Sequence, residues 1–221
     1  MSRAKRIALF GGTFDPIHAG HLAVARAARR ALGLDRVYFV TSGRPPHRRP
    51  KPVTPFLHRN AMVTLACAGD EGLLPSLLEA GPDFWGRRAY YSISTVRRMR
   101  RRLAPNDQLY FILGADAFAQ IQTWKNYRAL LETCHFVVAN RPGFSLIELA
   151  RVLPEEWIAR ARIRPRQIVL DGTSIHLLPS VHSPVRAREI RRRVRSGQSI
   201  RGMVPAAVEN YIRKMGLYAN A

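Results

Sequence analysis

One stretch decides the fold of this chain: Gly11-Gly12-Thr13-Phe14-Asp15-Pro16-Ile17-His18-Ala19-Gly20-His21. A short apolar run over 7–10 precedes it, and an alternating Ala/Leu/Arg segment over 22–32 follows it. This order predicts a strand, a glycine turn and a helix. The glycines let a ligand approach the backbone where a Cβ would block it. The helix start offers unpaired N–H groups and the positive end of the helix dipole, so the stretch predicts a phosphate site.

Two histidines sit at the predicted helix start. His18 and His21 are three residues apart, so they lie on one face and can contact neighbouring phosphate oxygens. Neither common glycine-rich nucleotide motif is present, because no Gly-x-Gly-x-x-Gly follows the first strand and the sequence has no Gly-Lys-Ser/Thr. The alternative interpretation is a glycine turn that caps a helix beside two incidental histidines.

The His-x-Gly-His pattern after Gly-Gly-x-Phe-Asp-Pro resembles the nucleotidyltransferase superfamily, whose members join a nucleoside monophosphate to a phosphate-bearing acceptor. The resemblance implies that His21 contacts the α-phosphate of the nucleotide, and that His18 helps to seat the phosphates of both substrates. The same stretch supplies expected ATP contacts at Gly11, Gly12, Thr13, Phe14 and Gly20.

Length and composition indicate a globular protein. The chain has 221 residues, of which 47% are hydrophobic and 23% charged. We expect an α/β domain over 1–183 and a C-terminal helical segment over 184–221 packed on the same domain. No apolar run spans a bilayer, and the basic start is followed by too few apolar residues for a signal peptide. Cys67 and Cys134 lie among apolar residues, which predicts buried reduced thiols and a cytoplasmic protein.

The charge balance is strongly basic. The formal net charge is +21, from 36 Lys and Arg against 15 Asp and Glu. One interpretation is a surface for nucleic acid, and the other is free use of arginine on solvated helix faces. The basic residues are scattered and no nucleic-acid-binding signature accompanies them, so we favour the second interpretation. A triphosphate pocket would also gain from the positive field.

The expected fold is a doubly wound, Rossmann-like parallel sheet of about five strands. A continuous apolar run over 37–40 predicts a second strand covered on both faces, joined to the first by a right-handed crossover. Helical spacing follows over 56–68, a weaker strand over 73–78, and a clear buried strand over 108–113. A further strand is expected over 134–139.

A proline-rich loop over 43–52 follows the second strand on the same rim as His18. It carries Pro45-Pro46-His47-Arg48, and we interpret it as a cationic arm that brings Arg48 to ATP; the alternative is a solvated linker. The sequence resembles the Pro-Pro-His-Lys of one branch of the superfamily, the bacterial nicotinate-nucleotide adenylyltransferases. Arg48 in place of the lysine keeps the charge.

The same branch suggests where the acceptor nucleotide binds. Tyr90 to Thr95 enters a helix that runs to about residue 103, where a Ser or Thr can cap the helix, and Ser92 stands where the family's acceptor-contacting Thr stands. Another strand-to-helix turn supplies Gly114 and Asp116 for the nucleotide. The polar neighbours of Trp124 suit an exposed ring, and the resemblance implies that it stacks on the pyridine of the acceptor. Lys125 and Arg141 complete the predicted acceptor contacts.

The last third of the chain is expected to hold a basic helical stretch over 145–166, and then two short strands, 167–170 and 174–178, around a turn. An Arg-rich helix over 184–195 stops at Gly197, and a closing helix follows over 204–218. Superfamily members have Ile-Ser-Ser-Thr-x-Ile-Arg at the start of the Arg-rich helix. This chain keeps the final Ile-Arg at Arg191, a predicted catalytic residue, but has Arg186 and Arg188 at two hydroxyl positions, and we expect Arg188 to contact ATP.

The resemblance covers nearly the whole chain and implies reaction of ATP with nicotinate mononucleotide to give deamido-NAD and pyrophosphate. Mg²⁺ is expected to arrive with ATP, because no carboxylate cluster offers a dedicated metal site. One alternative is a related enzyme for nicotinamide mononucleotide, phosphopantetheine or FMN; another is a basic nucleic-acid-binding protein without turnover. The sequence leaves open the nicotinate or nicotinamide preference and whether the chain forms a homo-oligomer.

Overall fold

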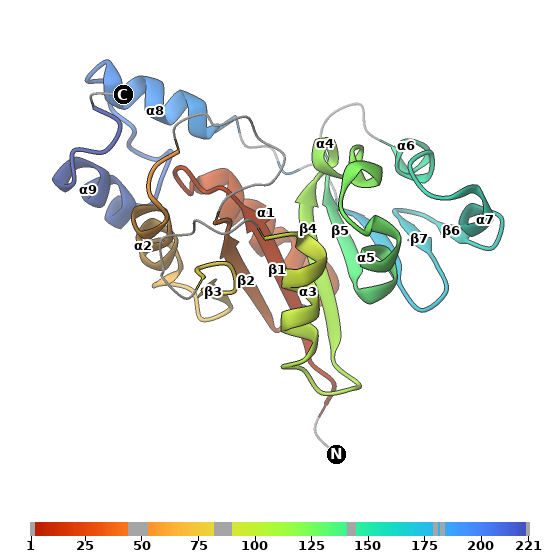
Figure 1. Cartoon of the computed structure of the whole chain (residues 1–221). Coiled ribbons are helices and arrows are strands. Elements are labelled where there is room, and N and C mark those ends of the chain that lie inside the picture. The colour runs from red at the N-terminus through yellow and green to blue at the C-terminus, as the bar shows by residue number, and fades with distance from the viewer. Residues whose placement is uncertain are drawn as a thin grey trace.

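An eight-stranded sheet forms the centre of the computed structural model (Figure 1), in the order β3-β2-β1-β4-β5-β8-β7-β6. The structure describes residues 3–43, 53–81, 90–140, 145–178, 181 and 184–219. The first six strands in this order pair in parallel. The last two, β7 and β6, add an antiparallel edge. The parallel strands are β1 (Arg6–Gly12), β2 (Arg36–Thr41), β3 (Leu73–Ser76), β4 (Gln108–Gly114), β5 (His135–Ala139) and β8 (Ser174–Leu178).

The doubly wound fold predicted from the sequence is confirmed, and the strand count differs. About five strands were expected, but β8 pairs in parallel with β5 and also anchors the antiparallel hairpin. The expected helical stretch over 145–166 is wrong at its end, where β6 (Arg162–Arg164) pairs with β7 (Gln167–Val169). The reason is local: Arg166 takes a left-handed φ of 62°, which turns the chain back into a hairpin.

Side chains of successive strand residues alternate between two cores. Ala8 and Phe10 of β1 face one core, and Ile7 and Leu9 face the other. The first core is covered by α1 (Ala19–Leu32), α2 (Phe56–Cys67), α8 (Ala187–Arg195) and α9 (Ala206–Lys214). The second core is covered by α3 (Ser92–Arg100), α4 (Ala115–Phe118), α5 (Tyr127–Thr133) and α6 (Leu146–Ala150), with the 3₁₀ turn η1 (Ile121–Thr123), while α7 (Glu155–Ile158) lies at its periphery.

The C-terminal helices join the first core. Ile190 of α8 and Val208 and Ile212 of α9 are buried in the same cluster as Phe10. Figure 1 shows α9 beside α2 and α8 above them, both away from the hairpin edge. The closing helix expected over 204–218 ends earlier, at Lys214, because Gly216 and Tyr218 take positive φ values of 60° and 68°. The boundary at residue 183 stays a prediction.

The strand order changes direction between β1 and β4, which neighbour each other although β2 and β3 lie between them in the sequence. In sheets of this kind a crevice opens beyond the carboxyl ends of the strands at such a switch point. Gly11 and Gly12, expected as a turn, are the last two residues of β1, and Gly114 is the last residue of β4, so both strand ends lie there. The fold therefore brings the two predicted nucleotide-binding turns together.

Candidate active site

The glycine turn is closely packed around Phe14. A Cβ added to Gly12 would lie 2.8 Å from the Phe14 ring, so no larger residue fits without a shift. Phe14 itself is 2% exposed and packs edge-on against Phe10 and His21. Its side chain is therefore part of the core, and contact with a nucleotide is left to its backbone.

The two histidines stack at the start of α1. Their ring centroids lie 3.7 Å apart with planes inclined by 25°, and His18 is the N-cap residue of the helix. The backbone N–H of His18 donates to Nδ1 of His21 over 3.3 Å. This bond leaves the proton of a neutral His21 ring on Nε2, which can donate to an oxygen of a ligand. Within the described ranges, the buried Nδ1 of His18 has no hydrogen-bond partner.

Both rings are neutral at physiological pH. Burial lowers the pKa of His18 to about 4. Burial, and to a smaller extent the charge of His18, lowers the pKa of His21 to about 3. The pair therefore offers hydrogen-bond donors rather than fixed positive charge. A bound phosphate would favour the charged forms and raise both pKa values.

The buried guanidinium group of Arg59 stabilises the glycine turn through hydrogen bonds to backbone carbonyl groups. Arg59 of α2 is 3% exposed and donates to the carbonyl oxygens of Thr13 and Thr54 over 2.7 Å and of Ser42 over 2.8 Å. It also donates to the carbonyl of Gly43. These bonds tie Thr13 to the residues that follow β2, Ser42 and Gly43, and to Thr54, which precedes α2. Arg191 of α8 reaches the same region from the other side, where its guanidinium donates to the carbonyl oxygen of Asp15.

A cavity of about 340 Å³ opens beside the turn at the β1–β4 switch point. We call it the acceptor cavity. Six of the residues predicted from the sequence line it, which are Gly11, Gly12, Ser92, Gly114, Trp124 and Lys125. The structure thus brings predicted ATP contacts and predicted acceptor contacts to one place. No side chain lies where a Cβ on Gly114 would point, within 4 Å and among the residues described, so that wall has free space.

The Trp124 indole in the wall of the acceptor cavity is less exposed than expected from the sequence. Trp124 is partly buried and packs at 89° against Phe111, with 6.3 Å between ring centroids. Lys125 is exposed, and its Nζ lies 4.4 Å from the centre of the Tyr91 ring. The indole is therefore held by its contact with Phe111 while it lines the cavity. A fixed ring binds a flat heteroaromatic at a smaller entropic cost than a mobile one.

A buried carboxyl group, which the sequence analysis missed, also lines this cavity. Glu79 is 8% exposed and accepts a hydrogen bond from the hydroxyl of Thr95 over 2.7 Å. The expected cap of α3 by a Ser or Thr is wrong: the helix begins at Ser92, so Tyr91 is the N-cap residue and no side chain caps the helix, while the Thr95 hydroxyl inside the helix donates to Glu79. Burial raises the pKa of Glu79 to about 7, against the effects of Thr95, the Gly43 N–H, Arg98 and Arg59.

Several other predicted residues do not line the acceptor cavity. Asp116 is exposed in the first turn of α4, two residues beyond Gly114. Gly20 is buried in the first turn of α1, and Arg188 is exposed on α8, three residues before Arg191. Arg48, with the Pro-Pro-His-Arg loop, and Arg141 fall outside the described residues.

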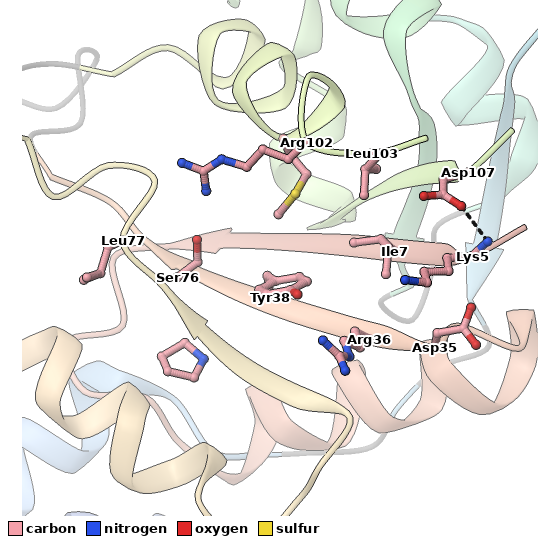
Figure 2. Close-up of a pocket in the computed structure, with 12 residues that line it drawn as sticks. Lys5, Ile7, Asp35, Arg36, Tyr38, Ser76, Leu77, Arg102, Leu103 and Asp107 are labelled. Carbon is pink, nitrogen blue, oxygen red and sulfur yellow. Dashed lines mark hydrogen bonds between the residues drawn. The ribbon is translucent and has the colours of Figure 1, made fainter. Parts of the chain in front are cut away.

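A second, larger cavity of about 710 Å³ lies on the sheet face beside α3, between the start of β1 and the end of β3 (Figure 2). None of the predicted site residues lines it. Its two carboxylates are already engaged: Asp35 accepts from Arg3 and from the backbone of Arg6, and Asp107 accepts from the backbone of Lys5. Among the described residues, no group of three or more His, Cys, Asp or Glu side chains is placed to hold a metal ion.

Sequence reasoning also missed Arg59, Asp15 and Ser42. The Ser42 hydroxyl is buried beside the acceptor cavity and has no hydrogen-bond partner in the part of the chain that the structure describes. Arg59 lies in α2, and from the sequence alone an arginine in a surface helix is expected to be exposed to solvent. The sequence offers one weak indication of its burial: a charged residue on the apolar face of a helix is expected to have a buried partner.

The parallel sheet, the glycine turn and the paired histidines are those of a nucleotidyltransferase. The family model described as cytidylyltransferase-like matches residues 9–193. The chain is 41% identical over 219 residues to the nicotinate-nucleotide adenylyltransferase of Moorella thermoacetica, covering 99% of this chain and 94% of that protein. It is 42% identical over 216 residues to that of Thermus thermophilus, covering 96% and 99%.

A solved structure shares the fold at lower identity. The Plasmodium falciparum nicotinic acid mononucleotide adenylyltransferase complexed with NaAD superposes with a TM-score of 0.70, 20% identity and 97% coverage of both chains. The chain belongs to the cytidylyltransferase-like family and, within it, to the nicotinate-nucleotide adenylyltransferases.

Proposed function

We propose that the protein transfers AMP from ATP to nicotinate mononucleotide, releasing pyrophosphate and forming deamido-NAD. The observation that carries the proposal is the acceptor cavity, where Gly11 and Gly12 at the end of β1 meet Ser92, Trp124 and Lys125. Family membership supports the same reaction. The names of the relatives match it as well.

The phosphate side of the site consists of the Gly11–His21 turn and Arg191. His21 donates from Nε2 to the α-phosphate, and His18 helps to seat the phosphates of both substrates. The N-terminal amides of α1, with Gly11, Gly12, Thr13, Phe14 and Gly20, add main-chain contacts. Arg191 and Arg188 act on the triphosphate as charged donors, and Gly114 at the end of β4 and Asp116 in the first turn of α4 contact the nucleotide. Arg48 is proposed for the triphosphate from sequence alone.

The acceptor side consists of Ser92, Trp124 and Lys125, with Arg141 proposed from sequence alone. The Trp124 indole stacks on the pyridine ring, and the Lys125 ammonium, which is exposed at the cavity, attracts an anionic acceptor. Ser92 is the first residue of α3 and lines the cavity, and the N–H groups in the first turn of a helix have no partner within the helix. The positive charge of Lys125 favours the carboxylate of nicotinate over the neutral amide of nicotinamide. A negative charge on Glu79 would oppose this preference.

The chemistry requires positioning and charge stabilisation rather than a protein nucleophile. The acceptor phosphate oxygen is already nucleophilic, so it attacks the α-phosphorus directly while pyrophosphate leaves from the opposite side. The N–H donors of His18, His21 and Arg191 stabilise the charge that grows on the α-phosphate and on the leaving group. Neither histidine acts as a general base, although low pKa values keep both rings neutral before substrate arrives.

We propose that ATP enters as its Mg²⁺ complex, so the metal belongs to the substrate. The absence of a three-ligand acidic or histidine cluster, within the residues described, fits that assignment. Both cysteines are buried free thiols, which suits the cytoplasm, where we place the protein. In the described part of the chain no helix is long and apolar enough to cross a membrane.

An acceptor panel tests the proposal. Purified protein with ATP and Mg²⁺ receives nicotinate mononucleotide, nicotinamide mononucleotide, phosphopantetheine or FMN, and pyrophosphate and product are measured. We expect turnover confined to the pyridine nucleotides, with nicotinate mononucleotide preferred. Turnover on phosphopantetheine or FMN would contradict the role of Trp124. No turnover with any acceptor, together with salt-dependent binding of RNA or DNA, would favour a nucleic-acid-binding protein instead.

A further inference from the structure

The C-terminal tail reaches the glycine turn through one buried hydrogen bond. The hydroxyl of Tyr218 donates to Oδ1 of Asp15 over 2.7 Å, and the two residues are 203 positions apart in the sequence. Tyr218 is 7% exposed and Asp15 is 8% exposed. Burial, and then the neighbouring Asp15 carboxylate, raises the pKa of Tyr218 above its usual range, so the hydroxyl keeps the proton that it donates.

Asp15 lies within the phosphate-binding turn and is also the partner of Arg191. Nη1 of Arg191 donates to the main-chain oxygen of Asp15 and lies 4.0 Å from its Oδ2. The backbone N–H of Thr54 reaches the same Oδ2 over 3.4 Å. One residue thus receives donors from α8, from the segment before α2 and from the tail.

A second contact joins the same C-terminal segment to the turn. The backbone N–H of Ala19, the first residue of α1, donates to the carbonyl oxygen of Met203 over 2.9 Å. Ala19 lies between the two histidines. The segment after α8 therefore holds the turn at two points, one at Ala19 and one at Asp15.

We propose that Tyr218 is a positioning residue for the triphosphate, because its hydroxyl occupies Oδ1 of Asp15 and so leaves Arg191 directed at the phosphates. A guanidinium is a stronger partner for a carboxylate than a neutral donor is. Without the Tyr218 hydroxyl, Oδ1 of Asp15 loses its buried donor, and among the described residues Arg191 is the cation that lies within 4.0 Å of the carboxylate. Its guanidinium then closes the 4.0 Å gap and turns away from the phosphates. The inference rests on the proposed role of Arg191.

Tyr218→Phe removes only the hydroxyl and keeps the ring in the core. Tyr211→Phe is the matched control, because its hydroxyl bonds Nδ1 of His58 over 2.9 Å in the same C-terminal segment but not in the turn. Initial rates are measured against ATP and against the acceptor, and thermal unfolding of each variant is followed by circular dichroism. The same measurements are made on Arg191→Lys and on the double variant Tyr218→Phe/Arg191→Lys.

We expect Tyr218→Phe to raise the KM for ATP about tenfold, the equivalent of one hydrogen bond to a charged group. The KM for the acceptor stays within about twofold, and Tyr211→Phe changes neither constant. In the Arg191→Lys background the effect of Tyr218→Phe disappears, because the two residues act through one interaction.

Three results would overturn the inference: an unchanged KM for ATP in a folded Tyr218→Phe, an equal change in Tyr211→Phe, or a full Tyr218→Phe effect in the Arg191→Lys background. The same measurements distinguish a failure of the proposed function from a failure of this inference. If Arg191→Lys alone leaves the KM for ATP at the wild-type value, the proposed role of Arg191 is wrong. If Arg191→Lys raises it and Tyr218→Phe does not, only the inference about Tyr218 is wrong.

Discussion

The phosphate side and the acceptor side of the site are built in different ways. The phosphate side is mostly one contiguous stretch, residues 11–21, held from behind by Arg59 and the C-terminal segment. The acceptor side is assembled from the ends of β3 and β4, the start of α3 and the turn at Trp124, which are far apart in sequence. The phosphate side therefore depends on backbone geometry, and the acceptor side depends on side chains that tertiary packing brings together. Substitutions on the two sides should affect different kinetic constants.

The largest expected effect lies on the phosphate side. His21→Ala removes the Nε2–H donor that we assign to the α-phosphate, so kcat should fall by about 100-fold or more. The KM for the acceptor should change little. Steady-state rates of pyrophosphate release measure both constants.

His58→Gln is the matched control for this variant, because His58 bonds Tyr211 rather than the turn. It should keep the wild-type kcat. A His21→Ala protein that remains folded and loses less than about threefold in kcat would contradict the assigned role.

Trp124→Ala tests the acceptor side. Loss of base stacking should raise the KM for nicotinate mononucleotide about tenfold, with the KM for ATP unchanged. Trp157→Ala is the control, because Trp157 packs at the edge of the second core and does not line the acceptor cavity. If both variants change the acceptor KM equally, the effect reflects loosened packing and not stacking.

Glu79→Gln should remove part of the pH dependence of acceptor binding. The pKa of Glu79 is raised to about 7, so its carboxyl is largely neutral at pH 6 and largely charged at pH 8. A charged carboxylate repels an anionic acceptor, so the wild-type acceptor KM should rise about threefold over that range relative to the variant. The acceptor's own phosphate titrates equally in both proteins. Glu132→Gln, at an exposed position on α5, should behave as wild type.

The same group predicts a change in stability. A carboxyl whose pKa is raised by folding stabilises the protein below its unfolded pKa, and that stabilisation is lost as pH rises through about 7. Relative to Glu79→Gln, the wild-type free energy of unfolding should fall by about 3 kcal/mol between pH 4.5 and 8. Urea titrations at the two pH values measure the difference. A constant difference would mean that Glu79 is charged throughout.

The smallest effect is expected at Arg188, which stands where the superfamily has a hydroxyl residue. It is exposed and lies three residues before Arg191, so the two share one face of α8. Arg188→Ala should raise the KM for ATP about threefold, more at low salt than at high salt. Arg195→Ala, on the same face but about two turns further along the helix, should not change it. Equal effects of the two substitutions would indicate the general positive field alone.

The difference between the two sides also explains how much the sequence could predict. The order of strands and helices around the turn followed from apolar runs and glycines, and the parallel topology predicted that the loop after the second strand shares a rim with His18. The switch point between β1 and β4 was not predicted. The hairpin of β6 and β7 was partly missed, because an Arg-Ile-Arg strand at a sheet edge has no apolar run. The roles of Glu79, Asp15 and Tyr218 were missed because each of them depends on a hydrogen-bond partner that is distant in sequence. Only the tertiary structure pairs them.

The most direct test of the account is the stereochemical course at the α-phosphorus. The enzyme is given ATP that carries one sulfur atom of defined configuration on the α-phosphate, and the configuration of the dinucleotide product is determined. One direct attack by the acceptor phosphate, with both substrates held in one site, predicts inversion. Retention would require two displacements through a covalent intermediate on the protein, and would contradict direct transfer between the phosphate side and the acceptor side.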